Sequence, residues 1–380
     1  MNISTWYQVH FEKYLSGRYI TLKDLLPLLQ KMPKTFKVSK AGTSENGLDI
    51  PLIKFGQGKK KVLAWSQMHG NESTTTKALF DFFKLIGSES IFETSVKRFL
   101  EEYTFFVIPM LNPDGALLYT RHNANDIDLN RDAQALSQKE SIVLRILFEE
   151  VKPDICLNMH DQRSVFGTLN GFPATISFLT PSADQKRTVT AARKEAMRYI
   201  LKAERYLQTH IPNQVARFDD AFNANCVGDT FSQLGVPTIL FEAGHYDLDY
   251  NREKTREFIF YSLAAMFTEI ASEHTKAINH KLYFDIPENQ KNCADVLLKN
   301  VFLPDSKNTQ DIALQYDEKL MDGNIVFQLR ISDIGVKNIK YGHKIFNLNG
   351  NEVLINSQKK FHIGQDVESI FDQKRNLMLI

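Results

Sequence analysis

Apolar residues follow two alternating patterns between residues 60 and 272. Short apolar runs have the length of buried strands: KVLAWSQM, TFFVIPML, DICLNM and VPTILFEA. Between them lie stretches that we predict to be helical: STTTKALFDFFKLIG, KESIVLRILFEEVK, residues 183–208 and NREKTREFIFYSLAAMFTEIAS. Strands that alternate with amphipathic helices predict an α/β fold, in which a largely parallel sheet is covered by helices on both faces.

The first 59 residues have a different pattern. Residues 1–33 are predicted to be helical, and TLKDLLPLLQKM opens with Thr21 as a candidate N-cap. In 36–56 the segments FKVSKAG and LDIPLIKFG alternate between apolar and polar residues, with the turn residues SENG between them, which predicts a hairpin. We therefore assign residues 1–59 to N-terminal helices and a hairpin that pack on the α/β domain.

The end of the chain changes pattern again. From about residue 281, short alternating segments are separated by Gly and Asn turns: LYFDIP, DIALQY, NIVFQLRIS, GHKIFNLNG and NEVLINS. This composition predicts a small β domain. The expected division of the chain is thus 1–59, an α/β domain over 60–280, and a small C-terminal β domain over 281–380.

Composition and charge exclude several classes of protein. The chain has 380 residues, 43% hydrophobic and 24% charged, with a formal net charge of +1. These values are ordinary for globular proteins and provide no overall field toward nucleic acid or an anionic membrane. The N-terminus lacks the features of a secretory signal, and no apolar run approaches the roughly 18 residues of a membrane span. We expect neither nucleic acid nor membrane as a partner.

The three cysteines are Cys156, Cys226 and Cys293, and they lie far apart in the sequence without any CxxC pair. An odd and sparse set argues against a disulfide framework and against a thiolate zinc site. The simplest interpretation is that all three are small buried residues in a reducing compartment. We therefore expect a cytoplasmic protein.

Four segments rich in polar and metal-binding residue types interrupt the apolar pattern. They are MHGNE (68–72), NPDG with TRHNANDIDLNRD (within 112–132), MHDQ (159–162) and FEAGH (241–245). All but the later part of the second directly follow an apolar strand. Ligands bind at the carboxyl ends of strands in open parallel sheets. The sequence therefore predicts that these distant segments meet in one crevice.

His69, Glu72 and His160 are the candidate metal ligands. A catalytic zinc site takes about three protein ligands and keeps one position open for water. A His with an acidic residue three positions later occurs about once by chance among ten histidines and 45 acidic residues in 380 positions, so the pair alone is weak evidence. A histidine at a strand end is also often structural. Asp161 could orient a ligand from behind, or simply cap a helix.

Glu242 is the candidate general base. It ends the apolar strand VPTILF, where a carboxylate without a partner would be costly. A structural ion pair is the alternative explanation. In the polar segment, Arg121, Asn130 and Arg131 are candidate anion-binding groups, because a guanidinium is the natural bidentate partner of a carboxylate and a cation near a metal can hold the oxyanion of a tetrahedral intermediate. A solvated loop would have a similar composition.

Taken together and in order, the four segments resemble the zinc carboxypeptidase superfamily over about residues 60–250. HGNE is similar to its HxxE ligand motif, NPDG to the turn before its substrate-binding arginines, and MHD to the segment of its second ligand histidine. RHNANDIDLNRD resembles the Arg…Asp-Leu-Asn-Arg pattern of the family, which is the most specific signal, and FEAGH resembles the segment of its catalytic glutamate.

The resemblance implies a zinc metallohydrolase with one zinc ion per chain, held by His69, Glu72 and His160. It further implies Glu242 as general base and later acid, and Arg121 polarising the scissile carbonyl. Asn130 and Arg131 would clamp the substrate carboxylate. The implied fold is a three-layer α/β/α sandwich around a mixed, mainly parallel sheet of about eight strands.

Two departures from the family pattern leave the substrate open. The segment RFDDAFNANCVGD has no counterpart of the substrate-contacting tyrosine, for which Tyr246 is a weak substitute. The compact ligand spacing and the β-rich tail resemble the succinylglutamate desuccinylase and aspartoacylase branch. The leading hypothesis is a metallocarboxypeptidase that hydrolyses the C-terminal peptide bond. The alternatives are an N-acyl amino acid amidohydrolase, and an inactive scaffold that binds zinc.

Overall fold

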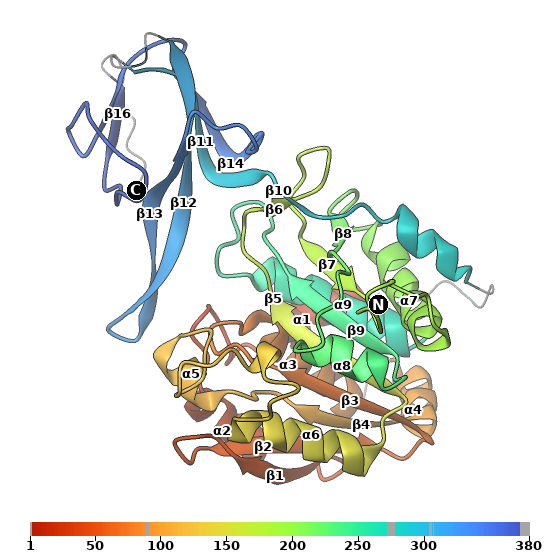
Figure 1. Ribbon diagram of the computed structural model, residues 1–380. Coiled ribbons are helices and arrows are strands. Elements are labelled where there is room, and N and C mark those ends of the chain that lie inside the picture. Colours follow the sequence, from red (N-terminus) through yellow and green to blue (C-terminus); the bar gives the residue numbers. More distant parts are fainter. Residues whose placement is uncertain (1, 89–90, 272–277, 304–305, 307, 373–380) are drawn as a thin grey trace. The chain divides into compact units, whose positions relative to one another are not determined.

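The computed structural model describes residues 2–88, 91–271, 278–303, 306 and 308–372. The chain forms two compact units. The larger comprises Met1–Gln162 and Thr175–Glu288, and the smaller comprises Arg163–Ala174 and Asn289–Ile380 (Figure 1). Within the described residues, no helix combines the length and the apolar character that crossing a membrane requires.

An eight-stranded mixed sheet forms the middle of the larger unit, in the order β1-β2-β4-β3-β5-β9-β7-β8. Its strands are β1 (Lys37–Thr43), β2 (Asp49–Gly56), β3 (Lys60–Ser66), β4 (Tyr103–Ile108), β5 (Ile155–Asp161), β7 (Ile176–Leu179), β8 (Val215–Arg217) and β9 (Thr238–Ala243). The central strands β4, β3, β5 and β9 are mutually parallel. The predicted hairpin is β1–β2, which extends the sheet through an antiparallel pairing of β2 with β4.

Helices cover both faces of this sheet, as predicted (Figure 1). One face carries α1 (Ile3–His10), α2 (Leu22–Gln30), α3 (Thr74–Gly87), α4 (Glu93–Glu102), α7 (Ala191–Leu207) and α9 (Glu253–Phe267). The other carries α6 (Lys139–Val151) and α8 (Val227–Gln233). Two apolar cores therefore sandwich the sheet, and the strand ends that bear polar residues emerge between them. Thr21 caps α2 through a capping box with Asp24, as expected.

Several sequence predictions need correction. The long helix predicted over 183–208 begins only at Ala191, because the Thr190 side chain accepts a hydrogen bond from the N–H of Arg193. NPDG is the start of helix α5 (Pro113–Leu118), which Asn112 caps. LYFDIP is a 3-10 helix, η2 (His280–Asp285), and not a strand. Its buried positions recur every third residue, at Tyr283 and Ile286, which matches three residues per turn.

The smaller unit is the expected β domain. Its sheet has the order β13-β12-β11-β14, built from β11 (Cys293–Phe302), β12 (Thr309–Met321), β13 (Asn324–Ile334) and β14 (Tyr341–Asn347). Strand β11 was missed by the pattern analysis because its first six residues are buried without alternation. The pair β15 (Val353–Ile355) and β16 (Ile370–Asp372) contributes to its core, and β6 (Phe166–Gly167) pairs with β10 (Gln290–Lys291).

A buried ion pair fixes the N-terminal segment to the larger unit. Arg256 on α9 binds Asp81 on α3 in bidentate fashion, at 2.6 Å for both contacts, and both side chains are fully buried. The same guanidinium donates to the carbonyl oxygens of Glu12 and Leu15. The Asp81 carboxylate in turn accepts from the N–H of Glu12. One charge pair thus satisfies the backbone of a segment that has no regular structure of its own.

We predict that Asp81→Asn destabilises the protein by about 3–5 kcal/mol, because the buried Arg256 guanidinium loses its bidentate, fully buried counter-charge and keeps the pair with the more exposed Glu253. The matched control is Asp49→Asn, which breaks the pair with Lys40 on the exposed hairpin. It should cost at most about 1 kcal/mol. Urea unfolding of the two variants measures both effects, and equal losses would contradict this account of the buried pair.

Candidate metal centre

Three side chains converge at the carboxyl ends of neighbouring strands. His69 and Glu72 lie in the connection from β3 to α3, and His160 lies near the end of β5, which pairs with β3. The Nδ1 atom of His69 is 2.8 Å from Oε1 of Glu72, and Nδ1 of His160 is 2.9 Å from Oε2. The two Nδ1 atoms are 3.1 Å apart. All three residues are buried, and one ligand atom from each lies within 4.8 Å of the others.

The chemistry of these atoms fits a divalent cation such as zinc. Burial lowers the pKa of His160 even though Glu72 opposes the shift, which favours the neutral imidazole that presents a lone pair to a metal. Burial would also raise the pKa of Glu72, but the charge of His69 and the hydrogen bonds from both histidines outweigh it and hold that pKa well below its usual value. Two imidazole nitrogens and a carboxylate that meet at one point are a typical zinc ligand set.

Asp128 is the most important residue of the site that sequence reasoning missed. Its Oδ1 lies 3.0 Å from Nε2 of His69, on the side of the ring away from the other ligands. Burial opposes its charge, but the contact with His69 and the charge of Arg121 hold the pKa of Asp128 well below its usual range. A carboxylate in this place accepts a hydrogen bond from Nε2–H of His69 and leaves Nδ1 free to bind a metal. The sequence signal was its place in NDIDLNR, two residues before Asn130.

Arg121 lies beside the candidate ligands. Its Nε and NH2 donate to Oδ2 of Asp128 at 3.1 and 3.0 Å, and its NH1 is 3.3 Å from Oε1 of Glu72. The guanidinium is still partly exposed, with 43% of its side chain accessible. Asp128 therefore orients both a ligand histidine and the cation next to the ligands, and Arg121 retains a face that can meet a substrate.

Glu242 lies directly opposite His160. Strands β5 and β9 run parallel with His160 and Glu242 as partners, so both side chains project from the same face of the sheet. Burial raises the pKa of the Glu242 carboxyl well above its usual value, and the charges of Glu72 and Asp161 add to the shift while Arg121 opposes it. Within the described residues this carboxyl has no hydrogen-bond or ion-pair partner, which leaves it available for proton transfer.

Asn130 and Arg131 lie in a short 3-10 helix, η1 (Leu129–Arg131), which Asp128 caps. The Oδ1 atom of Asn130 accepts the N–H of Val227 at the start of α8, so its position is fixed. The Arg131 side chain is exposed and donates to the carbonyl oxygen of Asn130. The structure thus places both residues on the segment that carries Asp128, but neither touches the three candidate ligands.

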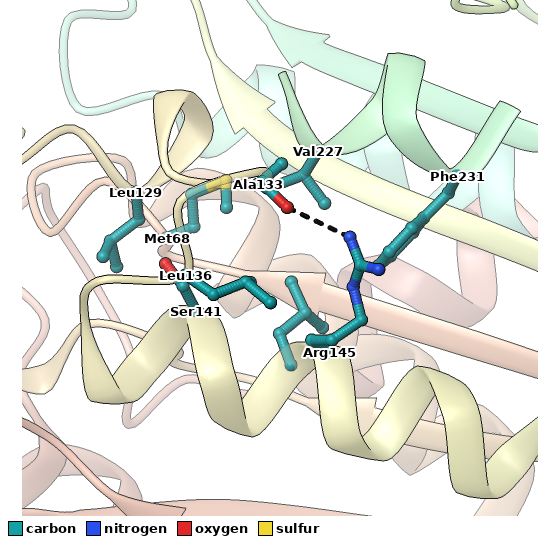
Figure 2. A pocket seen from close by; sticks show the side chains of 9 residues that line it. Met68, Leu129, Ala133, Leu136, Ser141, Arg145, Val227 and Phe231 are labelled. Atoms are coloured by element: carbon teal, nitrogen blue, oxygen red, sulfur yellow. Dashed lines mark hydrogen bonds between the residues drawn. The ribbon is translucent and has the colours of Figure 1, made fainter. Parts of the chain in front are cut away.

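A small cavity behind this segment shows how it is held (Figure 2). The space is about 10 Å³, room for about one water molecule. Met68, next to His69, and Leu129, next to Asp128, both line it. The Arg145 guanidinium on α6 donates to the carbonyl oxygen of Ala133 at 3.0 Å, which closes the loop over the cavity. Apolar neighbours in sequence therefore anchor the polar residues of the site in the core.

Glycines bring the HGNE and NPDG segments together. A Cβ atom on Gly70 would overlap the backbone of Gly115 and Ala116, and one on Gly115 would overlap Asn112 and the carbonyl oxygen of His122. The N–H of Asn71 also donates to the carbonyl oxygen of Thr120. The glycine in each motif is therefore required by close backbone approach, which brings Arg121 up to Glu72.

Two weaker expectations take a different form in the structure. Asp161 does not orient a ligand histidine with its carboxylate, which binds Thr74 and Arg18 instead; its backbone N–H donates to Oε2 of Glu72. Tyr246 packs edge-on against Phe258 as part of the larger unit's core.

The larger unit is thus an α/β domain with a candidate His-Glu-His metal site at the carboxyl ends of its parallel strands. Residues 22–199 match the sequence profile of the zinc carboxypeptidase family. Carboxypeptidase 2 of Trichophyton rubrum is 29% identical over 104 residues, which is 27% of this chain. The chain spans only about a fifth of that relative's length, since the alignment covers 19% of it.

Two solved structures share the fold. A metallo-carboxypeptidase from Burkholderia cenocepacia superposes with a TM-score of 0.50 at 19% identity, over 63% of this chain and 66% of that one. Bovine thrombin-activatable fibrinolysis inhibitor, solved in complex with tick carboxypeptidase inhibitor, superposes with a TM-score of 0.50 at 15% sequence identity. The superposition covers 65% of this chain and 96% of that one. The chain is thus similar to zinc carboxypeptidases in sequence over residues 22–199, and it shares their fold.

We predict that the purified protein holds one zinc ion per chain and that His160→Ala weakens zinc binding by at least about 100-fold, because a ligand is lost from a set of three. His122→Ala is the matched control, since His122 is exposed and pairs with Asp126 outside the site. Metal analysis after dialysis and chelator competition measure both variants. Equal zinc retention in the two would refute the ligand assignment.

Proposed function

We propose that this protein is a zinc-dependent carboxypeptidase that hydrolyses the C-terminal peptide bond of substrates with a free carboxylate. One observation carries the proposal: a carboxyl without a partner, that of Glu242, faces the same side of the sheet as His160 from the adjacent strand. The match of residues 22–199 to the zinc carboxypeptidase family supports hydrolysis in general, and the arrangement of this chain's own residues supports the particular reaction.

Zinc held by His69, Glu72 and His160 would supply a Lewis acid and lower the pKa of water at the open position. Glu242 takes the proton from the attacking water and delivers it to the leaving amine. The raised pKa of Glu242 suits its role as base, because a carboxylate that is more basic than usual accepts a proton from water more readily. The positive charge of the metal would offset the repulsion between Glu242 and Glu72.

Arg121 is the candidate stabiliser of the oxyanion that forms when the carbonyl is attacked, because its partly exposed guanidinium lies against Glu72. Arg131 and Asn130 are the candidate clamp for the substrate carboxylate. Within the described residues the exposed guanidinium of Arg131 forms no ion pair, although its charge acts on Asp229, and a planar donor pair suits a carboxylate. Binding at this clamp would position the last peptide bond next to Glu242.

The first experiment offers the zinc-loaded protein mixed peptides beside N-acetyl and N-succinyl amino acids, with and without a chelator. Release of C-terminal residues that a chelator abolishes is the expected result. Release from the acyl amino acids alone would assign the protein to amidohydrolysis of those compounds. Bound zinc without turnover of either set would leave a zinc-binding scaffold.

Glu242→Gln should lower kcat by about 10²–10⁴-fold while zinc remains bound, because the change removes proton transfer and no metal ligand. Steady-state kinetics with metal analysis of the same sample measures both quantities. Glu204→Gln, on helix α7, is the control substitution and should leave kcat unchanged. Activity of Glu242→Gln within tenfold of the parent would exclude Glu242 as the base.

Arg131→Ala should reduce kcat/KM for substrates with a free carboxylate far more than for their amidated analogues, because only the former lose a charged partner. The expected selectivity loss is at least about tenfold. Arg98→Ala on α4 removes an exposed arginine that pairs with Glu269 and serves as the control. Equal losses on both substrate types would rule out the clamp.

A further inference from the structure

Two buried arginines lie behind the candidate site, on the face of the sheet opposite to His160. Arg18 comes from the N-terminal segment between α1 and α2, and Arg252 immediately precedes α9. Only 6% and 4% of their surfaces are exposed. Neither lies within the family match over residues 22–199. Both approach Asp161, the residue that follows His160, closely enough for their charges to act on it.

Arg252 joins the ends of the strands that carry His160 and Glu242. Its NH1 donates to the carbonyl oxygen of Ala243 and its NH2 to that of Gln162, both at 2.9 Å. Ala243 is the last paired residue of β9, and Gln162 follows Asp161, the last paired residue of β5. The planar guanidinium fits both acceptors at once, which a single ammonium cannot do.

The backbone of Arg252 is itself held in an unfavourable conformation. Its φ of 61° and ψ of 26° place a long side chain in the left-handed region. Such a conformation costs about 1–3 kcal/mol and persists only where the surroundings impose it. Here the N–H of Arg252 donates to the carbonyl oxygen of Asp249, and its own carbonyl accepts the first helical N–H of α9, from Arg256. The strain is consistent with a fixed position for the guanidinium.

Arg18 joins the two segments that supply the candidate metal ligands. Its NH1 lies 3.1 Å from Oδ2 of Asp161 and 3.2 Å from Oγ1 of Thr74, two residues after Glu72. Thr74 Oγ1 donates to the same Asp161 oxygen at 2.6 Å. The carbonyl oxygen of Arg18 accepts from the Ser73 hydroxyl at 2.6 Å. The contacts therefore connect the neighbours of Glu72 to the neighbour of His160.

From these contacts we infer that Arg18 and Arg252 are positioning residues of the active site, with separate tasks. Arg18 fixes the ligand segments of Glu72 and His160 against each other, and Arg252 fixes the strand of the base Glu242 against the strand of His160. The part of the inference that concerns Arg252 rests on the proposed function, because it is tested by kinetics. The part that concerns Arg18 rests on metal binding alone.

Because the two arginines are assigned different roles, their variants should differ in which property changes. A general loss of stability would not produce that difference. The variants are Arg18→Lys, Arg252→Lys and the control Arg193→Lys. Arg193 is as deeply buried and binds Asp220 and the carbonyl oxygen of Thr180, away from these strand ends. Zinc affinity is measured by chelator competition, site geometry by the absorption spectrum of the Co²⁺-loaded protein, folding by thermal unfolding, and kcat and KM on a peptide.

Arg18→Lys should weaken zinc binding by at least about tenfold and alter the Co²⁺ spectrum, in the range seen for residues that support metal ligands. Arg252→Lys should lower kcat by at least about tenfold, with KM and zinc affinity within about threefold. Arg193→Lys should lower the unfolding temperature alone.

Folded Arg18→Lys with parental zinc affinity and spectrum, or folded Arg252→Lys with kcat within twofold, would overturn the corresponding assignment. A parent protein without turnover would refute the proposed function, while the zinc and Co²⁺ measurements would still decide the role of Arg18.

Discussion

The pairing of β5 with β9 is the constraint on which the rest of the site depends. The parallel register sets His160 beside Glu242 on one face, and the alternation of the strand sends Asp161 to the other. A shift of one residue along either strand would turn one of these side chains into the opposite core. The polar groups can therefore meet only in this register, and the apolar residues that precede them in both strands hold it in place.

Concentrating charge at this edge requires compensation from several directions. Glu72, Asp128, Asp161 and Glu242 bring four carboxyl groups into a region of low solvent access. Arg121 opposes them from the ligand face, where the reaction is proposed to occur. On the opposite face, Arg18 binds Asp161 and the charge of Arg252 also acts on it. Burial and the charges of Glu72 and Asp161 raise the pKa of Glu242, and the opposing charge of Arg121 does not offset them.

The smaller unit is connected to this centre through the chain itself. The sequence leaves the larger unit after Gln162, two residues beyond His160, and returns at Thr175. In between, Ser164 binds Gln315 and His343, and Thr168 accepts a hydrogen bond from Asn292. The strand that ends in a candidate ligand therefore continues directly into a segment of the β domain. That segment is too short to have been distinguished by composition.

Local patterns determined much of the architecture. Apolar runs and helical spacing located the central strands and the main helices. Strands buried on both faces are continuously apolar, and helices that cover a sheet are apolar along one side. The motifs likewise identified His69, Glu72, His160 and Glu242, which the tertiary structure brings together. LYFDIP misled the analysis because its alternation of residue types does not match its burial, which recurs every third position.

Only the tertiary structure decided which distant groups support the site. Asp128 stood in a recognised motif, yet its contact with His69 depends on how two loops approach each other. Arg18 and Arg252 stand in no motif, and their partners lie up to 143 residues away in sequence. The type of a residue determines what its side chain can bind. Whether the contact forms depends on where the folded backbone places the two residues, which the packing of the whole core decides. The sequence therefore specified the candidate reacting groups, and the fold specified which distant residues hold them in place.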